Sequence, residues 1–357
     1  MKTRLTDLLA IRYPILLPGM SWISTPPLVA AVSQAGGLGI LATGPLTAEE
    51  TRSAIAAIRA RTDRPFGIGC TLMMPGAREN AEVALAERVP VINFSLGKGD
   101  WLVPRCHAYG GKVIATVTTV RHAQSAQRAG VDALLVTGHE AAAHGGAVTS
   151  LVLVPTIVDA VDLPVIAAGG IADGRGLLAA LALGASGVAM GSRLATTQES
   201  PLHEQVKEAV ISRSAHDTVY SPHFDGLPAR YMETPTSLRL NRKPIGFWRS
   251  AWQARQAARM VGQPVGKILL GLLTRLEQVK LLTQFGAAVP RLRAATEHGD
   301  LDRGMQFIGQ AQGLIRDRPT VQQLFERVCR EAEQAQQRTS ASWGQVGGQD
   351  RLAAGHL

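Results

Sequence analysis

The amino-acid sequence predicts an α/β fold, namely a (β/α)8 TIM barrel with a smaller, mostly helical second domain inserted late in the chain. Three observations carry this prediction. Eight short apolar segments recur before about residue 200, alanine-rich helical segments separate them, and glycine-rich loops follow the last two. Parallel strands that are buried on both faces form such apolar runs. A doubly wound open sheet would show the same alternation, but the count of eight and the terminal glycine loops favour the barrel.

The eight expected strands lie far enough apart for a helical crossover between neighbours. They cover residues 14–17, 38–42, 66–70, 90–94, 112–116, 133–137, 164–168 and 187–190. Crossover helices are expected at residues 27–35, 54–61, 122–129 and 177–183. Gly36 and Gly37 end the first of these helices, and Thr47 followed by two glutamates is a typical N-cap. In such a barrel, the loops at the carboxyl ends of the strands carry the chemistry.

The composition changes after Ser200, where prolines, tryptophans and long amphipathic stretches such as residues 267–283 appear. A final barrel-covering helix is expected at residues 305–316, and a charged terminal helix at 324–337. The domain prediction is therefore as follows. Residues 1–215 and 300–338 form the cofactor-binding barrel, residues 216–299 a helical substrate or lid domain, and residues 339–357 a flexible tail rich in serine, glycine and glutamine.

Several features of the composition bear on the cellular location of the protein. No apolar run reaches the ~18 residues of a membrane span, so membrane insertion is not expected. The basic start is interrupted by Asp7 and Arg12 and forms no signal-peptide core. Three widely spaced cysteines, Cys70, Cys106 and Cys329, fit neither a disulfide framework nor a zinc pattern. We expect a reducing, cytoplasmic location.

The formal charge of +9 is substantial, and much of the excess falls after residue 225. No nucleic-acid motif accompanies it, and only 4% of residues are aromatic, which leaves little for base stacking. We therefore expect no nucleic-acid partner. The basic surface is either a solvated face or a means of attracting an anionic substrate or nucleotide phosphate.

Glycines close the seventh and eighth expected strands, in residues 167–176 and 190–193. Gly169 and Gly170 end one strand, and Gly191 and Ser192 end the next; a helix start follows each. The loops at these two positions of a barrel commonly bind phosphate through backbone N–H groups. The glycines could instead serve only tight turns, but the pair together favours a phosphate-bearing cofactor.

His144 lies in a loop of small residues and glycines, residues 138–146, directly after the sixth strand. A histidine there has few local packing partners, and its near-neutral pKa suits abstraction of a proton from a carbon acid. His139 lies closer to the strand end, where it is expected to pack or cap. The two histidines are five residues apart in a glycine loop, unlike the i, i+4 spacing of helical zinc ligands, so we expect no metal. The sequence contains neither a nucleophile elbow nor a lysine at the end of an expected strand. Cys70 is expected to be a buried small side chain. A cofactor is therefore expected to do most of the chemistry.

These motifs together resemble one known family. Pro18-Gly19-Met20, Glu140-Ala-Ala-Ala-His144-Gly, the run at 167–176 and Met-Gly-Ser-Arg at 190–193 are similar to the nitronate monooxygenase (2-nitropropane dioxygenase-like) family. These FMN-dependent TIM barrels include NADH:quinone reductases and FMN-type enoyl-acyl carrier protein reductases. The resemblance extends to about residue 335.

The resemblance implies FMN as the cofactor, with NADH or NADPH as an electron donor in some members. It places the backbone of Gly19 and Met20 against the flavin ring. It assigns the FMN phosphate to four residues, Gly169, Gly170, Gly191 and Ser192. Gln310 would close over the cofactor, and His144 would act as catalytic base or substrate-positioning group.

The resemblance leaves the reaction open. The first interpretation is a nitronate monooxygenase, which oxidises alkyl nitronates with O2 to a carbonyl compound and nitrite. The second is an NAD(P)H-dependent reductase of a quinone or enoyl thioester, because residues 143–155 also look like those of the enoyl reductases. Gly69 stands where the family often has asparagine, and the fifth strand lacks a lysine seen in some quinone reductases. The third is a non-catalytic flavin- or phosphate-binding barrel. A small-molecule substrate is expected, and a homodimer is compatible with the sequence.

Overall fold

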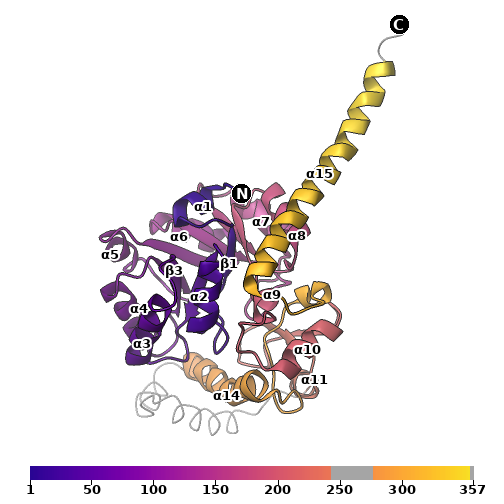
Figure 1. Cartoon of the computed structure of the whole chain (residues 1–357). Coiled ribbons are helices and arrows are strands. Elements are labelled where there is room, and N and C mark those ends of the chain that lie inside the picture. Colours follow the sequence, from indigo (N-terminus) through magenta and orange to yellow (C-terminus); the bar gives the residue numbers. More distant parts are fainter. Residues whose placement is uncertain (243–275, 354–357) are drawn as a thin grey trace.

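In the computed structural model, which describes residues 1–242 and 276–353, eight parallel strands close into a barrel (Figure 1). Each strand pairs with the next in sequence, and β1 pairs with β8 to complete the ring. The strands are β1 Ile15–Leu17, β2 Leu38–Ala42, β3 Phe66–Thr71, β4 Val91–Ser95, β5 Lys112–Val117, β6 Ala133–Thr137, β7 Val165–Ala168 and β8 Gly187–Ala189. The predicted TIM barrel is confirmed, and all eight strands lie where the sequence places them.

Helices alternate with these strands and cover the outside of the barrel (Figure 1). They are α1 Arg4–Leu9, α2 Pro26–Gln34, α3 Ala48–Arg59, α4 Ala77–Ala86, α5 Val103–His107, α6 Val120–Arg128, α7 Ser150–Val158, α8 Gly174–Ala182, α9 Gly191–Ala195 and α10 Glu204–Ser212. Thr47 caps α3 in a capping box with Glu50, as its sequence predicts.

The barrel interior is closed at its amino end by α1. Leu5 is fully buried and packs with Leu9 on apolar side chains from inside the barrel, such as Leu16 and Ile40. A Cβ at Gly187 would lie 2.4 Å from Leu5, so the glycine at the start of β8 makes room for this plug. Because one end is sealed by hydrophobic packing, the site is confined to the carboxyl ends of the strands.

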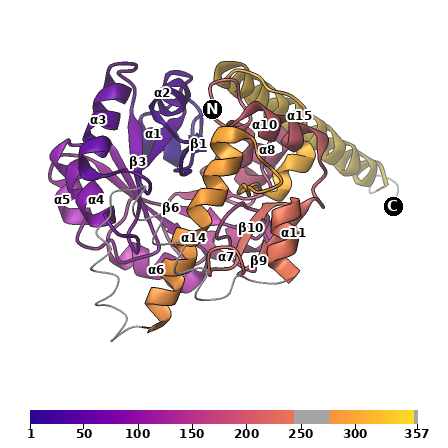
Figure 2. The ribbon, with the colours of Figure 1, turned by 90° about the horizontal axis from the view of Figure 1, so that it is seen from below.

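The region predicted as a second domain, which the name second domain denotes below, contains helices and a hairpin that the sequence analysis missed. Strands β9 Thr218–Ser221 and β10 Ala229–Met232 pair antiparallel, and the helices α11 Pro235–Arg242 and α14 Leu276–His298 pack nearby. Figure 2 shows α14 lying across the barrel beside this hairpin. The expected tryptophan-rich stretch and most of the amphipathic segment at 267–283 lie outside the described residues.

Residues 305–316 form no long helix, contrary to the prediction. Apart from the short 3-10 helix η1 Gln310–Leu314, they have no regular secondary structure. Their backbone N–H groups bond to other elements: that of Gly309 donates to the Ser192 hydroxyl at 2.9 Å, and that of Gln310 to the Glu140 carbonyl at 2.9 Å. The segment is therefore hydrogen-bonded both to the start of α9, at Ser192, and to the loop that carries His144.

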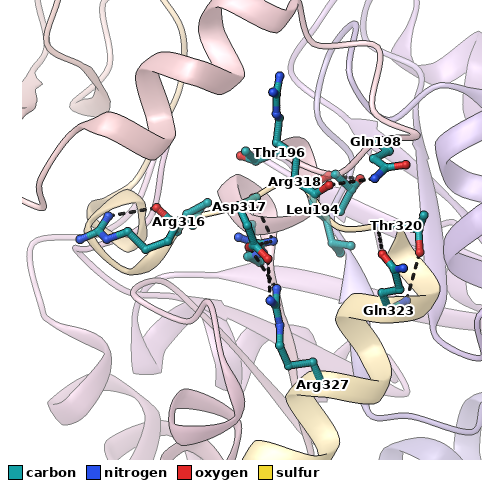
Figure 3. Close-up of polar contacts among 12 residues, drawn as sticks. Leu194, Thr196, Gln198, Arg316, Asp317, Arg318, Thr320, Gln323 and Arg327 are labelled. Carbon is teal, nitrogen blue, oxygen red and sulfur yellow. Dashed lines mark hydrogen bonds and ion pairs between the residues drawn. The ribbon is translucent and has the colours of Figure 1, made fainter.

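The last helix, α15 Val321–Ala353, packs against α8 and then projects away from the barrel (Figure 1). Its helical backbone continues well into the stretch that the sequence predicts to be a flexible tail. Figure 3 shows how its start is tied down: Arg327 points at Asp317, with a shortest distance of 2.6 Å. Asp317 also accepts from Arg193 at 2.9 Å, and Arg193 is almost fully buried behind the last barrel loop. Within the described ranges, no helix is both long and apolar enough to cross a bilayer.

Candidate active site

A cavity of about 1170 Å³ opens at the carboxyl ends of the barrel strands, between the barrel and the second domain. Seven of the eight residues proposed from the sequence line it: Gly19, Met20, His144, Gly169, Gly170, Gly191 and Ser192. Gln310 is the exception, because its neighbours Gly309 and Ala311 line the cavity while Gln310 does not. The structure thus brings residues from four strand ends into one site and leaves the expected cover residue outside it.

The loop after β7 has a backbone that requires glycine. Gly169 and Gly170 have φ values of +116° and +74°, a region that side-chain-bearing residues rarely adopt. A Cβ at Gly169 would also lie 2.8 Å from the Ser150 hydroxyl. Next to it, α9 starts at Gly191, and no side chain caps its first turn. Exposed N–H groups and absent side chains form the kind of cradle that a phosphate monoester fits.

The cradle is supported from beneath by the start of α7. Both oxygens of the Glu140 carboxylate accept from the Ser150 N–H, at 3.1 and 2.9 Å. The Ser150 hydroxyl lies 3.0 Å from Glu140 and 3.1 Å from the Gly169 carbonyl. The His144 loop and the phosphate loop are therefore held to the same helix start.

The floor of the cavity is built from the ends of β1 and β3. The Met20 N–H donates to the Ser24 hydroxyl at 3.0 Å, and that hydroxyl donates to the Pro18 carbonyl at 2.7 Å, which holds the turn in place. A Cβ at Gly19 would lie 3.6 Å from the Cα of Gly69, so the two glycines face one another. A flat ring can approach the backbone closely here.

Asn93 lies on the strand next to Gly69, the glycine at the position where the resembled family often has asparagine. Asn93 pairs in register with Gly69, is almost fully buried and lines the cavity. Its amide nitrogen donates to the Ile114 carbonyl at 3.1 Å and to the Thr116 hydroxyl at 3.0 Å. Sequence reasoning did not single it out, although an amide inside an apolar strand was a readable signal.

His144 has a partner that the sequence analysis did not find. Its Nε2 lies 3.2 Å from the Oδ2 of Asp225, and its Nδ1 lies 3.4 Å from the Pro228 carbonyl. The rings of Phe285 and Phe307 flank it, with centroids at 5.7 and 6.0 Å. Burial lowers the pKa of His144, but the Asp225 carboxylate and the Pro228 carbonyl outweigh it, so the net pKa is raised. The imidazole is therefore more easily protonated than an ordinary histidine.

The hairpin of the second domain fixes the His144 loop. Ala143 and Arg230 exchange backbone hydrogen bonds of 3.0 and 2.9 Å, an isolated antiparallel bridge between the loop and β10. The Tyr220 hydroxyl donates to the Gly145 carbonyl at 3.1 Å, and the Arg230 guanidinium donates to the His139 carbonyl at 3.1 Å. His139 itself packs, with its ring centroid 4.5 Å from that of Tyr220, as expected.

Other catalytic chemistries find little support in the described residues. Burial raises the pKa of the Cys70 thiol to about 11, which keeps it protonated and unreactive. No group of three or more His, Cys, Asp or Glu side chains gathers as a metal site in the ranges that the structure covers. The site therefore combines a glycine cradle and an apolar floor with one histidine whose pKa is raised.

Comparisons with known proteins agree with this geometry. Residues 2–331 match the family model described as nitronate monooxygenase. The (3aS,4S,5R,7aS)-5-hydroxy-7a-methyl-1-oxo-octahydro-1H-indene-4-carboxyl-CoA dehydrogenase of Rhodococcus jostii is 36% identical over 338 residues, which cover 93% of this chain and 96% of that protein. A probable nitronate monooxygenase of Staphylococcus aureus is 34% identical over 275 residues, which cover 64% of this chain and 78% of that protein. The structure of FabK from Thermotoga maritima has a TM-score of 0.80 at 37% identity, covering 96% of this chain and 99% of that one.

Proposed function

The chain belongs to the nitronate monooxygenase family and is an oxidoreductase, and we propose that it uses FMN to oxidise or reduce an acyl thioester. The observation that carries the proposal is the placement of His144 in the same cavity as the paired loops Gly169–Gly170 and Gly191–Ser192. A cofactor cradle and a histidine with a raised pKa in one largely apolar cavity suit flavin-dependent chemistry on a substrate that develops negative charge.

The residues present fit FMN. Gly169, Gly170, Gly191 and Ser192 would hold the phosphate, because two positive φ values and an uncapped helix start leave backbone N–H groups free of side chains. Gly19 and Met20 would lie against the ring system, on the glycine floor beside β3. FMN supplies the acceptor or donor of electrons when it is bound.

The size and shape of the site favour a large substrate. The cavity of about 1170 Å³ exceeds the ~300–1,000 Å³ typical of a pocket for a single small ligand, so it has room beyond the cofactor. A relative that matches over nearly the whole chain is named as a dehydrogenase of a bicyclic acyl-CoA. His144 would bind the thioester carbonyl oxygen and stabilise the negative charge that develops there in an enolate-like transition state.

Nitronate oxidation, which the sequence analysis placed first, is the second candidate. The S. aureus relative carries that name, and a raised pKa at His144 suits the binding of a nitronate anion equally well. That relative matches over a smaller share of the chain than the acyl-CoA dehydrogenase does, which is why we place the thioester first.

One set of spectra separates these functions. We expect the purified protein to carry FMN, and oxidised protein mixed anaerobically with a cyclic acyl-CoA to lose its flavin absorbance. For the reductive direction, NADH or NADPH would bleach the flavin and an enoyl thioester would restore it. Nitrite release from a nitronate in air, with no response to any thioester, would make the second candidate the function. A protein that takes up no FMN would refute the proposal, and bound FMN inert to all these reagents would support a non-catalytic barrel.

A further inference from the structure

Asp225 is a buried carboxylate at the cavity whose place in the chain gave no hint of a role. It lies in the loop between β9 and β10 of the second domain and lines the cavity with an exposed fraction of only 1%. Its Oδ1 accepts from the Leu227 N–H at 3.2 Å, while its Oδ2 makes no hydrogen bond of good geometry. The group that faces Oδ2 is the Nε2 of His144, at 3.2 Å.

The surroundings of the pair are apolar. Phe285 and Phe307 flank His144, and Phe224 packs against Phe307 with ring centroids 5.3 Å apart. A carboxylate removed from water in such a place is costly unless a cation compensates it. A cation enclosed by aromatic rings is in turn favoured by their negative faces.

Among the described residues, the charged groups on the elements packed against the pair have partners of their own. From the loop of His144 itself, the Glu140 carboxylate accepts from the Ser150 N–H. From β10, the Arg230 guanidinium donates to the His139 carbonyl and to the Thr218 hydroxyl. Also from β10, Tyr231 has its pKa raised by burial and stays neutral. The segment at 305–309 and helix α14 present Phe307 and Phe285 to the imidazole.

Both ring nitrogens of His144 lie near acceptors. Nε2 is at ion-pair distance from the Asp225 carboxylate, without the geometry of a hydrogen bond, and Nδ1 lies 3.4 Å from the Pro228 carbonyl. A protonated ring can satisfy both neighbours, because its charge compensates the carboxylate and its Nδ1–H can donate to the carbonyl. At 3.4 Å, the contact with Pro228 is at the long end of the hydrogen-bond range, and a substrate oxygen could replace it. The carboxylate would then keep the charge on the ring while the other nitrogen binds the substrate.

We propose that Asp225 is a positioning residue that holds His144 as an imidazolium cation at neutral pH, so that His144 binds the anionic oxygen of the substrate and does not act as a general base. The proposal rests on the proposed function only in placing the substrate at His144. The direction of the His144 pKa, raised despite burial, agrees with it. The second domain thereby sets the charge of a residue that the barrel supplies.

The direct test is a pH titration of the His144 ring by 15N-edited NMR, with its signals assigned by comparison with His144→Gln among the nine histidines. We expect the wild-type ring to titrate above the ordinary value of about 6.5. In Asp225→Asn the burial remains and the carboxylate is gone, so the pKa should fall below that value. Asp225→Glu should restore most of the difference. Asp302→Asn removes an exposed carboxylate that does not line the cavity and should leave the titration unchanged.

The kinetic test uses whichever substrate proves active. In Asp225→Asn, kcat/KM should fall at least tenfold at pH 8 and recover as the pH is lowered, while KM for an anionic substrate rises at high pH. A thermal melt of each variant confirms that it is folded. A wild-type pKa below about 6.5, or an Asp225→Asn pKa equal to that of the wild type, would overturn the proposal. Because the titration needs no substrate, a failed thioester assay would refute the proposed function without touching this result.

Discussion

Replacing Gly169 by alanine tests the loop that is proposed to hold the FMN phosphate while leaving the rest of the barrel unchanged. The new methyl group would lie 2.8 Å from the Ser150 hydroxyl and 3.2 Å from the Ala141 nitrogen, on a residue whose φ is +116°. Holding alanine in that backbone region costs about 1–3 kcal/mol, before any steric clash is counted. We expect Gly169→Ala to lower the free energy of unfolding by roughly 2–4 kcal/mol, or the loop to move and release the strain.

A moved loop would misplace the N–H groups that are proposed to hold the FMN phosphate. Each hydrogen bond to a charged group is worth about 1.5–3 kcal/mol, and every 1.4 kcal/mol is tenfold in affinity. Loss of one or two such bonds should therefore raise the Kd for FMN by roughly 10- to 1,000-fold. Quenching of flavin fluorescence on titration of apo-protein measures this Kd, and melting of the apo-protein measures the strain.

The matched control is Gly110→Ala. Gly110 also has a positive φ, +83°, but a Cβ there would meet nothing within 4 Å. This variant should carry the backbone cost alone, about 1–2 kcal/mol, with an unchanged Kd for FMN. If Gly169→Ala binds FMN within threefold of the wild type, the loop after β7 does not hold the phosphate.

Three further changes test the site and its frame. His144→Gln should lower kcat/KM by roughly 100- to 1,000-fold while FMN stays bound, because a donor to the substrate oxygen is lost. Loss of FMN together with activity would place His144 in the cofactor site instead. Leu5→Ala should lower the free energy of unfolding by about 2–5 kcal/mol, because it removes part of a fully buried side chain at the amino end of the barrel. Denaturant unfolding measures this loss, and activity per folded molecule should not change. A loss of less than ~1 kcal/mol would contradict the packing. The Arg327 hydrogen bonds, and the charges of Arg193 and Arg327, hold the pKa of Asp317 below its ordinary value. A carboxyl group whose pKa is depressed by folding stabilises the protein above its unfolded pKa and loses that contribution as the pH falls through the folded pKa. Asp317→Asn should therefore lower Tm at pH 7, and the gap to the wild type should close below about pH 4, where a constant gap would show that the ion pairs do not stabilise the fold.

Most of the barrel was predictable because its strands carry their signal locally. Runs such as 133–137 and 38–42 are almost entirely apolar and are followed by turn residues, and both appear as strands with the predicted bounds. The paired glycine loops were readable for the same reason, since a positive φ at Gly169 and Gly170 restricts the residue type at those positions. A backbone conformation that glycine adopts far more readily than other residues can therefore be recognised from the sequence.

The segment at 305–316 shows where local signals fail. Its apolar spacing suggested a helix, but its N–H groups donate to Ser192 and to the Glu140 carbonyl, so the backbone has no need of helical hydrogen bonds. The Gly309 position adds a close approach, because a Cβ there would lie 2.7 Å from the Glu140 carbonyl oxygen. Tertiary partners decided the conformation, and none of them is visible within the segment.

Asp225 was missed for a related reason. Its partner His144 is far away in sequence, and the two meet only because β10 forms a backbone bridge with the loop at Ala143. The barrel mouth itself is lined largely by glycines and apolar side chains, so the carboxylate facing the imidazole comes from the second domain. Docking of the hairpin and protonation of His144 are thus linked: whatever separates β10 from the loop also removes the carboxylate from the imidazole. Relatives with the same barrel could therefore differ in reaction by changing residues of the second domain alone, with every cofactor contact of the barrel left in place.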